Sequence, residues 1–370
     1  MSARPVVGWY VHHHGAGHVT RLLAVRPHLD ADVVVFSSLA APHDLPDATT
    51  WVLLPRDDHD VVGVDGVARA PGDPASGTDP TVRGLLHWAP LRHDGHAGRL
   101  AAIAAWVAHA RPRAFVVDVS VEVTLLVRLL GVPPVVVAQP GDRSDAPHSL
   151  GWDAAERVLA PWAEGLHVSP ALERVRDRVR WVGGVSRHDG RDDGPERPEP
   201  GSVLVLAGGG ADGRAGLARR VAEAAAATPS ARWSVLGDSA DSWVHDPWPF
   251  LRAAEVVVSA AGQNSVADLA ASASRAVVLP QQRPFDEQRA TALLLAAHGL
   301  AVVPGAGSPD GSAGGAPCAP EDAASGDAWP VPSAWPELLD RARALRPGWD
   351  LWQVQGAAAR AAAVVAEVAR

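Results

Sequence analysis

The residues best suited to chemistry lie in the segment 256–288 of this 370-residue chain. Its first four residues are a short β-branched run that predicts the end of a buried parallel strand. The small residues 260–265 predict a tight turn, and Asn264 or Ser265 could cap a helix over 266–274. A strand, a tight turn and a helix N-terminus direct unpaired backbone NH groups and the positive end of the helix dipole at one point. The segment therefore predicts an anion site, for which phosphate is the usual ligand.

Acidic and amide side chains follow this turn. Asp268 comes one helical turn further on, close enough to accept hydrogen bonds from a ribose attached to that phosphate. A second strand is expected over 276–279, and the loop after it carries Asp286, Glu287 and Gln288. Carboxylates and an amide beside an anion site are suited to holding sugar hydroxyls.

This segment resembles the donor-sugar signature of GT-B glycosyltransferases, most closely the family 28 C-terminal domain and, next, the family 1 enzymes. By position, the diphosphate turn corresponds to Gly262, Gln263, Asn264 and Ser265, the ribose acid to Asp268, and the donor-sugar pair to Glu287 and Gln288. One position departs from the pattern, because Ala260 stands where many family 1 enzymes have a phosphate-contacting histidine. Phosphate contact is then expected from backbone NH groups, Asn264 and Ser265.

A second strand, glycine loop and helix lie at the start of the chain. The run 6–11 predicts a strand, 19–29 a helix and 33–37 the next strand, which is typical of a doubly wound domain. The loop between them holds four histidines and two glycines: His12, His13, His14, Gly15, Gly17 and His18. His14 and His18 are spaced i, i+4, but the glycines disfavour a helix, and no Asp, Glu or Cys stands near them in sequence. We therefore expect no metal site, and a loop in which His14, Gly15 and Gly17 serve phosphate or acceptor while His12 and His13 only end the strand.

Gly17 and His18 resemble the Gly-His pair that supplies the general base in family 1. An acceptor hydroxyl has too high a pKa to attack an anomeric carbon unaided, whereas imidazole titrates near neutral pH. The strand expected over 114–117 runs into Asp118, which matches the acid that stabilises the charged imidazole in family 1. Asp118 could instead cap the following helix, and the sequence leaves both readings open.

The segment 183–201 is rich in Gly, Pro and charge and predicts a linker. We therefore expect an N-terminal domain over 1–182, a C-terminal domain over 202–352, and a last helix over 353–370 that packs back on the first domain. Gly208, Gly209 and Gly210 follow the strand expected at 202–206, and family 28 proteins have a comparable diphosphate turn there. The tract 305–327 is low in complexity and predicts an insertion.

The acceptor is expected to meet loops of the first domain, including 57–81, a helix over 85–110 and the loop 139–149. His87, Trp88, His93 and His96 could line that site, although helix faces and core packing are the more ordinary roles for such residues. The sequence does not distinguish a lipid, a polymer or a small metabolite as the acceptor.

Composition excludes several functional classes. All 33 basic residues are Arg, so a Walker-type lysine and a Schiff-base lysine are both excluded. A net charge of -9 argues against nucleic acid as a partner. A single cysteine, Cys318, rules out an internal disulfide and fits a cytoplasmic protein. No run of about 18 apolar residues predicts a membrane span, and no signal peptide is expected, while peripheral membrane contact stays open.

These observations predict an α/β protein of the GT-B class, with two Rossmann-like doubly wound domains facing across a cleft. The resemblance implies an inverting, metal-independent transferase that moves a sugar from a UDP or TDP donor to an acceptor hydroxyl, with the nucleotide sugar as co-substrate and no further cofactor. A non-hydrolysing nucleotide-sugar epimerase and a non-catalytic accessory subunit are the alternatives.

Overall fold

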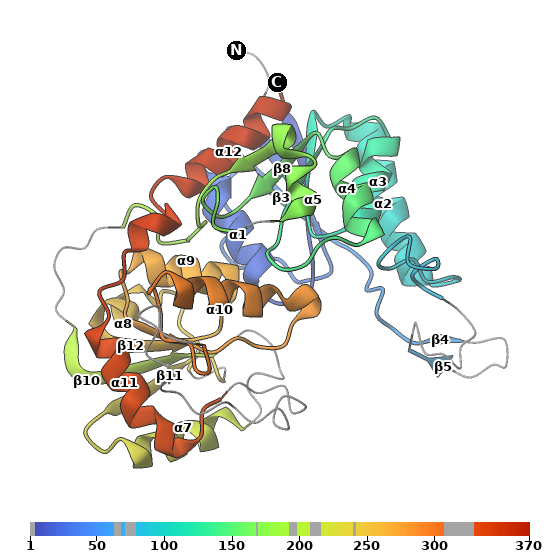
Figure 1. Ribbon diagram of the computed structural model, residues 1–370. Helices are drawn as coiled ribbons and strands as arrows, with labels where there is room; N and C mark the ends of the chain where they lie inside the picture. The colour runs from blue at the N-terminus through green and yellow to red at the C-terminus, as the bar shows by residue number, and fades with distance from the viewer. Residues whose placement is uncertain are drawn as a thin grey trace.

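The computed structural model describes residues 4–62, 68–70, 79–167, 169–191, 198–207, 216–239, 242–306 and 329–370. They form two α/β bodies, one above the other in Figure 1, with both chain termini on the upper one. The expected two-domain α/β architecture is confirmed. Among the described residues, no helix is long and apolar enough to span a bilayer.

The upper body contains a parallel sheet with the strand order β3-β2-β1-β6-β7-β8-β9. Its strands are β1 (Val6–Val11), β2 (Asp32–Ser37), β3 (Thr49–Leu53), β6 (Ala114–Asp118), β7 (Pro134–Val137), β8 (Arg157–Ala160) and β9 (Val179–Trp181). Side chains alternate across this sheet, so Val7 and Trp9 enter one core while Tyr10 enters the other. Both faces are covered, which explains why the central strands are almost entirely apolar.

Helices cover both faces of the upper sheet. They are α1 (Gly17–Val25), α2 (Asp94–Ala110), α3 (Val121–Leu129), α4 (Ala146–Ala154) and α5 (Pro170–Glu173), with the short 3-10 turns η1 (Arg26–His28) and η3 (Arg176–Arg178). The small antiparallel pair β4 (Val61–Val62) and β5 (Ala68–Arg69) projects from this body (Figure 1). The helix expected over 85–110 begins only at Asp94, because the residues before it form turns in which Arg92 has a positive φ and His93 is the N-cap.

The lower body is built on a second parallel sheet with the order β11-β10-β12-β13. Its elements are β10 (Glu199–Leu206), α7 (Leu217–Ala227), β11 (Arg232–Leu236), α8 (Trp248–Ala253), β12 (Ala254–Ser259), α9 (Gln263–Ala271), β13 (Ala276–Val278), η4 (Pro284–Asp286), α10 (Glu287–Ala297), η6 (Pro332–Ala334) and α11 (Trp335–Ala344). In Figure 1, α9 and α10 lie on the side of this body that faces the upper one.

The chain returns to the upper body through η7 (Trp349–Trp352) and ends in α12 (Ala357–Val368). Ala361 and Val365 of this helix join the core formed by Val7 and Leu22 of the first domain. Where the chain passes between the bodies, the Gly184 NH donates to the Trp352 carbonyl over 2.9 Å. A side chain at Gly184 would collide with the Trp352 ring, since a Cβ there would lie 2.3 Å from it.

Some predictions fall outside the described residues. The glycine turn Gly208, Gly209 and Gly210 is among them, as are 192–197 of the expected linker and 307–327 of the expected insertion.

Candidate functional site

A pocket of about 650 Å³ opens where the two bodies meet. Its N-terminal wall comes from the carboxyl ends of β1, β6 and β7 and the loops after them, and its C-terminal wall from the loop that includes Phe285 and Glu287. The carboxyl ends of strands at such a seam are the usual ligand site in open α/β sheets.

His18 and Asp118 meet at this seam. The His18 Nδ1 atom lies 3.0 Å from Asp118 Oδ1, and His18 is the second residue of α1, which follows β1. Strands β1 and β6 are paired, with Val11 opposite Asp118, so the register of the sheet brings the two side chains together. Because Asp118 occupies Nδ1, the Nε2 atom of this pocket-lining imidazole is left to receive a proton.

The same carboxylate binds a buried arginine. Arg21 NH1 donates to Asp118 Oδ1 over 2.7 Å, and the Asp118 side chain is fully buried. Burial alone would raise the pKa of Asp118, but the Arg21 and His18 charges outweigh it and hold this pKa below its ordinary value. Asp118 is therefore ionised at neutral pH and fixes the His18 ring.

Val119, directly after Asp118, has φ 65, a conformation that β-branched residues rarely adopt. Such strain persists where the surrounding structure imposes it, and it concentrates at functional sites. Here it turns the chain between Asp118 and Ser120, whose side chain caps α3. Ser120 therefore provides the cap, and Asp118 stays available for His18 and Arg21.

Arg21 also reaches the second domain. Its NH2 group donates to Gln263 Oε1 over 2.7 Å, and Asn264 Nδ2 donates to the Gly17 carbonyl over 2.5 Å. Gln263 and Gly17 are the first residues of α9 and α1. The N-termini of two helices thus meet across the seam, beside His18, and both positive helix ends lie there.

Helix α9 begins at Gln263, three residues before the position expected from the sequence. Neither Asn264 nor Ser265 caps it, because the N-cap is Gly262 in an extended conformation without a side-chain cap, and Asn264 binds Gly17 instead. First-turn NH groups of an uncapped helix favour an anionic ligand. The Gln288 Oε1 atom accepts hydrogen bonds from the Ala261 and Gln281 NH groups, so this amide holds the turn in place.

Asp268 is buried behind this turn, with 7 % of its side chain exposed. Its Oδ1 accepts from Ser186 Oγ over 2.6 Å, and Arg187 Nε lies 3.3 Å from its Oδ2. Burial raises the pKa of Asp268, while Arg187 and Ser186 oppose that rise. The expected ribose acid thus lies against the interdomain connection, which the sequence did not indicate.

Glu287 lines the pocket but is already paired across the seam. Arg143 NH2 lies 3.2 Å from Glu287 Oε2, and the Arg143 guanidinium lies 4.3 Å from the centre of the Phe285 ring. The Asp142 NH donates to the Phe285 carbonyl, and Gly141, with φ 93, leaves no room for a side chain there. These contacts hold the 283–287 loop against the loop that follows β7.

A pair of histidines elsewhere on the N-terminal wall of the pocket shares one carboxylate. His87 Nε2 lies 2.8 Å from Asp145 Oδ2, and His148 Nδ1 makes a short contact with Asp145 Oδ1. Burial and Arg143 lower the pKa of His148 to about 4, although Asp145 opposes this. His87, Trp88 and His96 line the pocket as considered from the sequence, whereas His93 caps α2.

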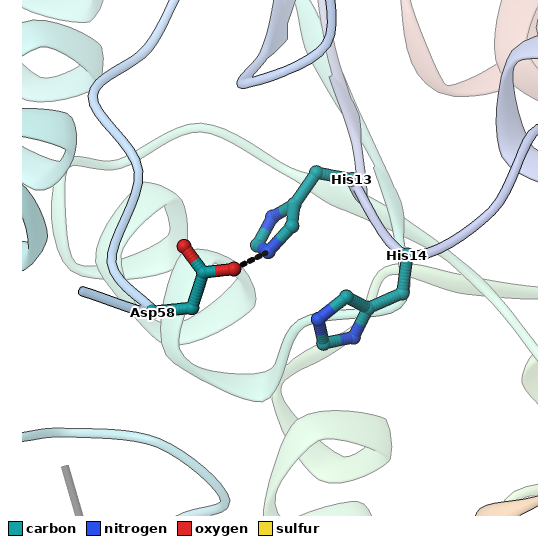
Figure 2. A group of neighbouring side chains, drawn as sticks. All are labelled: His13, His14 and Asp58. Carbon is teal, nitrogen blue, oxygen red and sulfur yellow. Dashed lines mark ion pairs between the residues drawn. The ribbon is translucent and has the colours of Figure 1, made fainter. Parts of the chain in front are cut away.

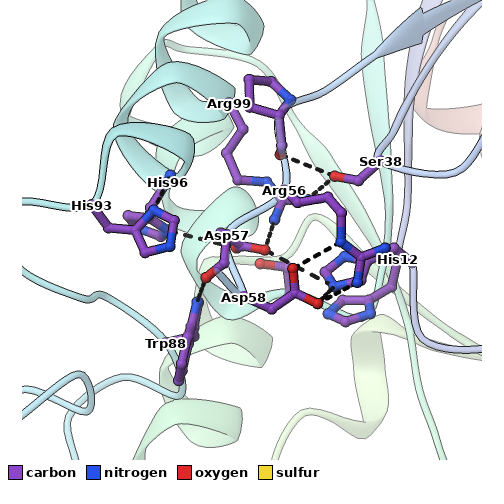
Figure 3. Close-up of polar contacts among 12 residues, drawn as sticks. His12, Ser38, Arg56, Asp57, Asp58, Trp88, His93, His96 and Arg99 are labelled. Atoms are coloured by element: carbon purple, nitrogen blue, oxygen red, sulfur yellow. Dashed lines mark hydrogen bonds and ion pairs between the residues drawn. The ribbon is translucent and has the colours of Figure 1, made fainter. Parts of the chain in front are cut away.

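Two of the remaining loop histidines, His13 and His14, lie near carboxylates from the loop after β3. Asp57 is held by the buried Arg99, and Asp58 by Arg56 over 2.8 Å (Figure 3). His13 Nε2 lies 4.0 Å from Asp57 Oδ1 and 3.8 Å from Asp58 Oδ2. Burial, followed by His14, lowers the pKa of His13 to about 4, so the ring is neutral. No acid stands near the histidines in sequence, but the fold brings Asp57 and Asp58 to them.

Sequence reasoning missed several residues that the structure brings to the site: Arg21, Asp57, Asp58, Arg143 and Arg187. Arg21 carried a usable signal, because it lies three residues after His18 and so on the same face of α1. The others join the site only through strand order and domain contact.

Comparison with known proteins identifies the fold. No protein-family model matches the chain, and no curated protein matches it either. Among solved structures, Phytolacca americana UGT2 complexed with UDP-2fluoro-glucose and pterostilbene is similar at a TM-score of 0.56 and 15% identity, over 100% of this chain and 94% of that one. MurG from Acinetobacter baumannii gives 0.54 and 16%, over 98% and 99%.

The spinosyn rhamnosyltransferase SpnG complexed with thymidine diphosphate gives a TM-score of 0.52 and 17% identity, over 94% of this chain and 99% of that one. These similarities extend through both bodies and the connection between them. The chain therefore has the GT-B fold over essentially its whole length.

Proposed function

We propose that this protein is a glycosyltransferase that moves a sugar from a nucleotide-diphosphate donor to an acceptor hydroxyl. The observation that carries this proposal is the meeting of two uncapped helix N-termini, at Gly17 and Gln263, beside the His18 and Asp118 pair. An anion site and a general base at one seam are what transfer from a diphosphate requires. The fold shared with the three transferases above supports the same reaction class.

In this proposal the diphosphate lies at the N-terminus of α9, against the NH groups of Asn264 and Ser265. Asp268 and Arg187 take the ribose end, and Gln288 Nε2 and Glu287 take the sugar. Glu287 would have to exchange its contact with Arg143 for sugar hydroxyls. Two of the similar structures were solved with a UDP sugar and with thymidine diphosphate, which makes UDP and TDP the first donors to test.

The acceptor is proposed to enter the pocket of about 650 Å³ on the N-terminal side. This volume lies within the range of small-molecule sites. Trp88, Trp152 and Phe285 contribute aromatic surface to its lining. A small, partly aromatic acceptor fits this lining better than a polymer does.

The reaction is proposed as a single displacement that inverts the anomeric carbon. His18 Nε2 takes the acceptor proton as the acceptor oxygen bonds to the anomeric carbon, while the bond from that carbon to the diphosphate oxygen breaks. Asp118 stabilises the imidazolium that forms, and the nucleoside diphosphate leaves with the bonding electrons. The helix dipoles at Gly17 and Gln263 stabilise its added charge, so we expect transfer without a metal at the diphosphate.

The proposal is tested by thermal unfolding of the protein with UDP, TDP or GDP and with the nucleotide sugars of each base. Each measurement is made with and without a chelator. A ligand that binds only the folded state at 100 times its dissociation constant adds about 2.7 kcal/mol of stability. We expect a clear rise in Tm with UDP or TDP and no loss of that rise with chelator. An absence of any nucleotide effect would favour the non-catalytic alternative.

The second arm separates transfer from epimerisation. The stabilising donor is incubated with a panel of small phenols and alcohols, and the products are followed by mass spectrometry and NMR. A glycosylated acceptor with inverted anomeric configuration supports the proposal. An isomerised donor formed without acceptor would instead show an epimerase.

The single cysteine fits a reducing compartment, so we place this reaction in the cytoplasm.

A further inference from the structure

Three side chains with metal-binding atoms converge on the wall of the pocket that belongs to the first domain. His13 and His14 follow β1, and Asp58 follows β3. One ligand atom from each lies within 4.8 Å of the others. Figure 2 shows the His13 ring pointing at the Asp58 carboxylate with the His14 ring beside both. Adjacent positions of β1, β2 and β3 in the sheet bring these loops together.

Within the described part of the chain, His13 is a buried polar side chain whose ring nitrogens lack a hydrogen-bond partner. Only 3 % of its side chain is exposed, and among the described residues neither Nδ1 nor Nε2 makes a hydrogen bond. A buried polar atom left unpaired costs about 1–3 kcal/mol, so such atoms in native proteins call for an explanation. A cation bound between His13 Nε2 and Asp58 would give one of the two nitrogens a partner.

The two neighbouring carboxylates, Asp57 and Asp58, differ in how readily they could bind a metal ion. Asp57 is engaged by Arg99, whose side chain is 2 % exposed, and that buried pair is already neutralised. Asp58 is 35 % exposed, and its partner Arg56 is 43 % exposed. An exposed ion pair of this kind contributes about 0–1 kcal/mol, so Arg56 can turn into solvent and release Asp58 to a metal.

We propose that His13, His14 and Asp58 form a binding site for a divalent transition-metal ion, with Zn²⁺ as the reference ion. Two imidazoles and one carboxylate favour such ions over Mg²⁺ and Ca²⁺, which prefer oxygen ligands. Three protein ligands leave at least one coordination position free, and all three residues line the pocket. The open position thus faces the space assigned to the acceptor, and an acceptor oxygen could occupy it. The three ligands do not include Gly17 and Gln263, the helix N-termini at which the diphosphate is proposed to lie.

The test measures metal binding alone and does not require transferase activity. The full-length, tag-free protein is freed of metal with a chelator, dialysed, and titrated with Zn²⁺ and with Mg²⁺ by calorimetry. We expect one Zn²⁺ to bind per chain and no heat from Mg²⁺. Co²⁺ should replace Zn²⁺ and give visible absorption bands that report its coordination.

Variants assign the ion to its ligands. Loss of an outer-shell partner lowers metal affinity by about 10–100-fold. His14→Ala and Asp58→Asn each remove a direct ligand, so each should weaken Zn²⁺ binding by more than this. Arg56→Ala should tighten binding, because it removes the group that competes for Asp58. His13→Ala is less informative because this ring is buried, so the exposed His14 and partly exposed Asp58 decide the question. The Tm of each variant in chelator checks that it is folded.

Two control variants address other histidines. His43 lies 2.9 Å from Asp44 on the surface, and His87 belongs to the second group of potential ligands, with Asp145 and His148. His43→Ala and His87→Ala should leave Zn²⁺ affinity unchanged. The proposal is overturned if wild type binds no Zn²⁺, if Asp58→Asn or His14→Ala keeps wild-type affinity, or if His87→Ala abolishes binding.

Discussion

Two groups of histidine and carboxylate side chains flank the loop between β1 and α1. They differ in how closely the histidine approaches the carboxylate. On one side, His18 contacts Asp118 at 3.0 Å and Arg21 completes the group at 2.7 Å. On the other side, His13 lies 3.8 Å from Asp58 and its ring has no hydrogen-bond partner among the described residues. The same residue types thus form a closed, hydrogen-bonded group in one place and an open set of potential ligand atoms in the other.

The arginines explain part of this difference. Arg21 binds the same Asp118 oxygen as His18, so histidine, carboxylate and cation form one hydrogen-bonded unit around a buried carboxylate. Arg99 binds Asp57 but also donates to Tyr10 over 2.9 Å, and it thereby holds the carboxylate back from His13. A tightly bound carboxylate orients an imidazole, whereas a displaced one leaves it available to an external ligand.

The largest effect is expected from His18→Ala. Loss of a general base typically lowers the rate by about 10²–10⁴-fold, so kcat should fall by that amount while nucleotide affinity is retained. Steady-state kinetics and nucleotide titration check this, and the surface variant His43→Ala is the matched control. An equal loss of nucleotide binding would show that His18, Asp118 and Arg21 contribute to donor binding and not to proton transfer.

Removing the arginines tests whether both carboxylates depend on a buried cation. Arg21→Met and Arg99→Leu should each lower the free energy of unfolding at pH 7 by about 3–5 kcal/mol, because each removes the arginine partner of a buried carboxylate. Arg21 is the largest influence that opposes burial, so its loss should raise the pKa of Asp118 relative to the wild type. The destabilisation relative to the wild type should therefore shrink as the pH falls and Asp118 takes up a proton.

The exposed pair provides the control for this experiment. Arg56→Ala removes the partner of Asp58 at the surface and should cost less than about 1 kcal/mol. Denaturant unfolding of all three variants at pH 7 and pH 5 measures the effect. If Arg99→Leu proves as mild as Arg56→Ala, Asp57 does not depend on its buried arginine.

The smallest effect is expected from Arg21→Lys. An ammonium keeps the positive charge at Asp118 but cannot donate to Asp118 and Gln263 together in the geometry of the guanidinium. We expect kcat/KM to fall by about 10-fold, the equivalent of one hydrogen bond to a charged group. Gln263→Ala removes the other end of the same contact and should not add to that loss. Fully additive losses would show that Arg21 does not link the base to α9.

Sequence patterns predicted the elements that carry the site better than the contacts within it. The strand 6–11 and the strand that ends at Asp118 follow from short apolar runs, which report burial directly. The start of α9 was placed too late, because Asn264 is a favourable cap by type but binds Gly17 of the other domain. Asp58 could not be associated with His13 from sequence, since the order of β1, β2 and β3 decides that contact.

The two passages of the chain between the bodies lie side by side, as the hydrogen bond between Gly184 and Trp352 shows. A single connection would let one domain swivel in any direction, whereas two adjacent connections favour bending about one axis through both. Opening of the seam should then separate Gln263 from Arg21 along a reproducible path. The contact between Arg21 and the start of α9 would form only when the domains are closed. The proposed base would then lie beside the proposed donor site only in the closed form, which would limit wasteful hydrolysis of a bound donor in the open form.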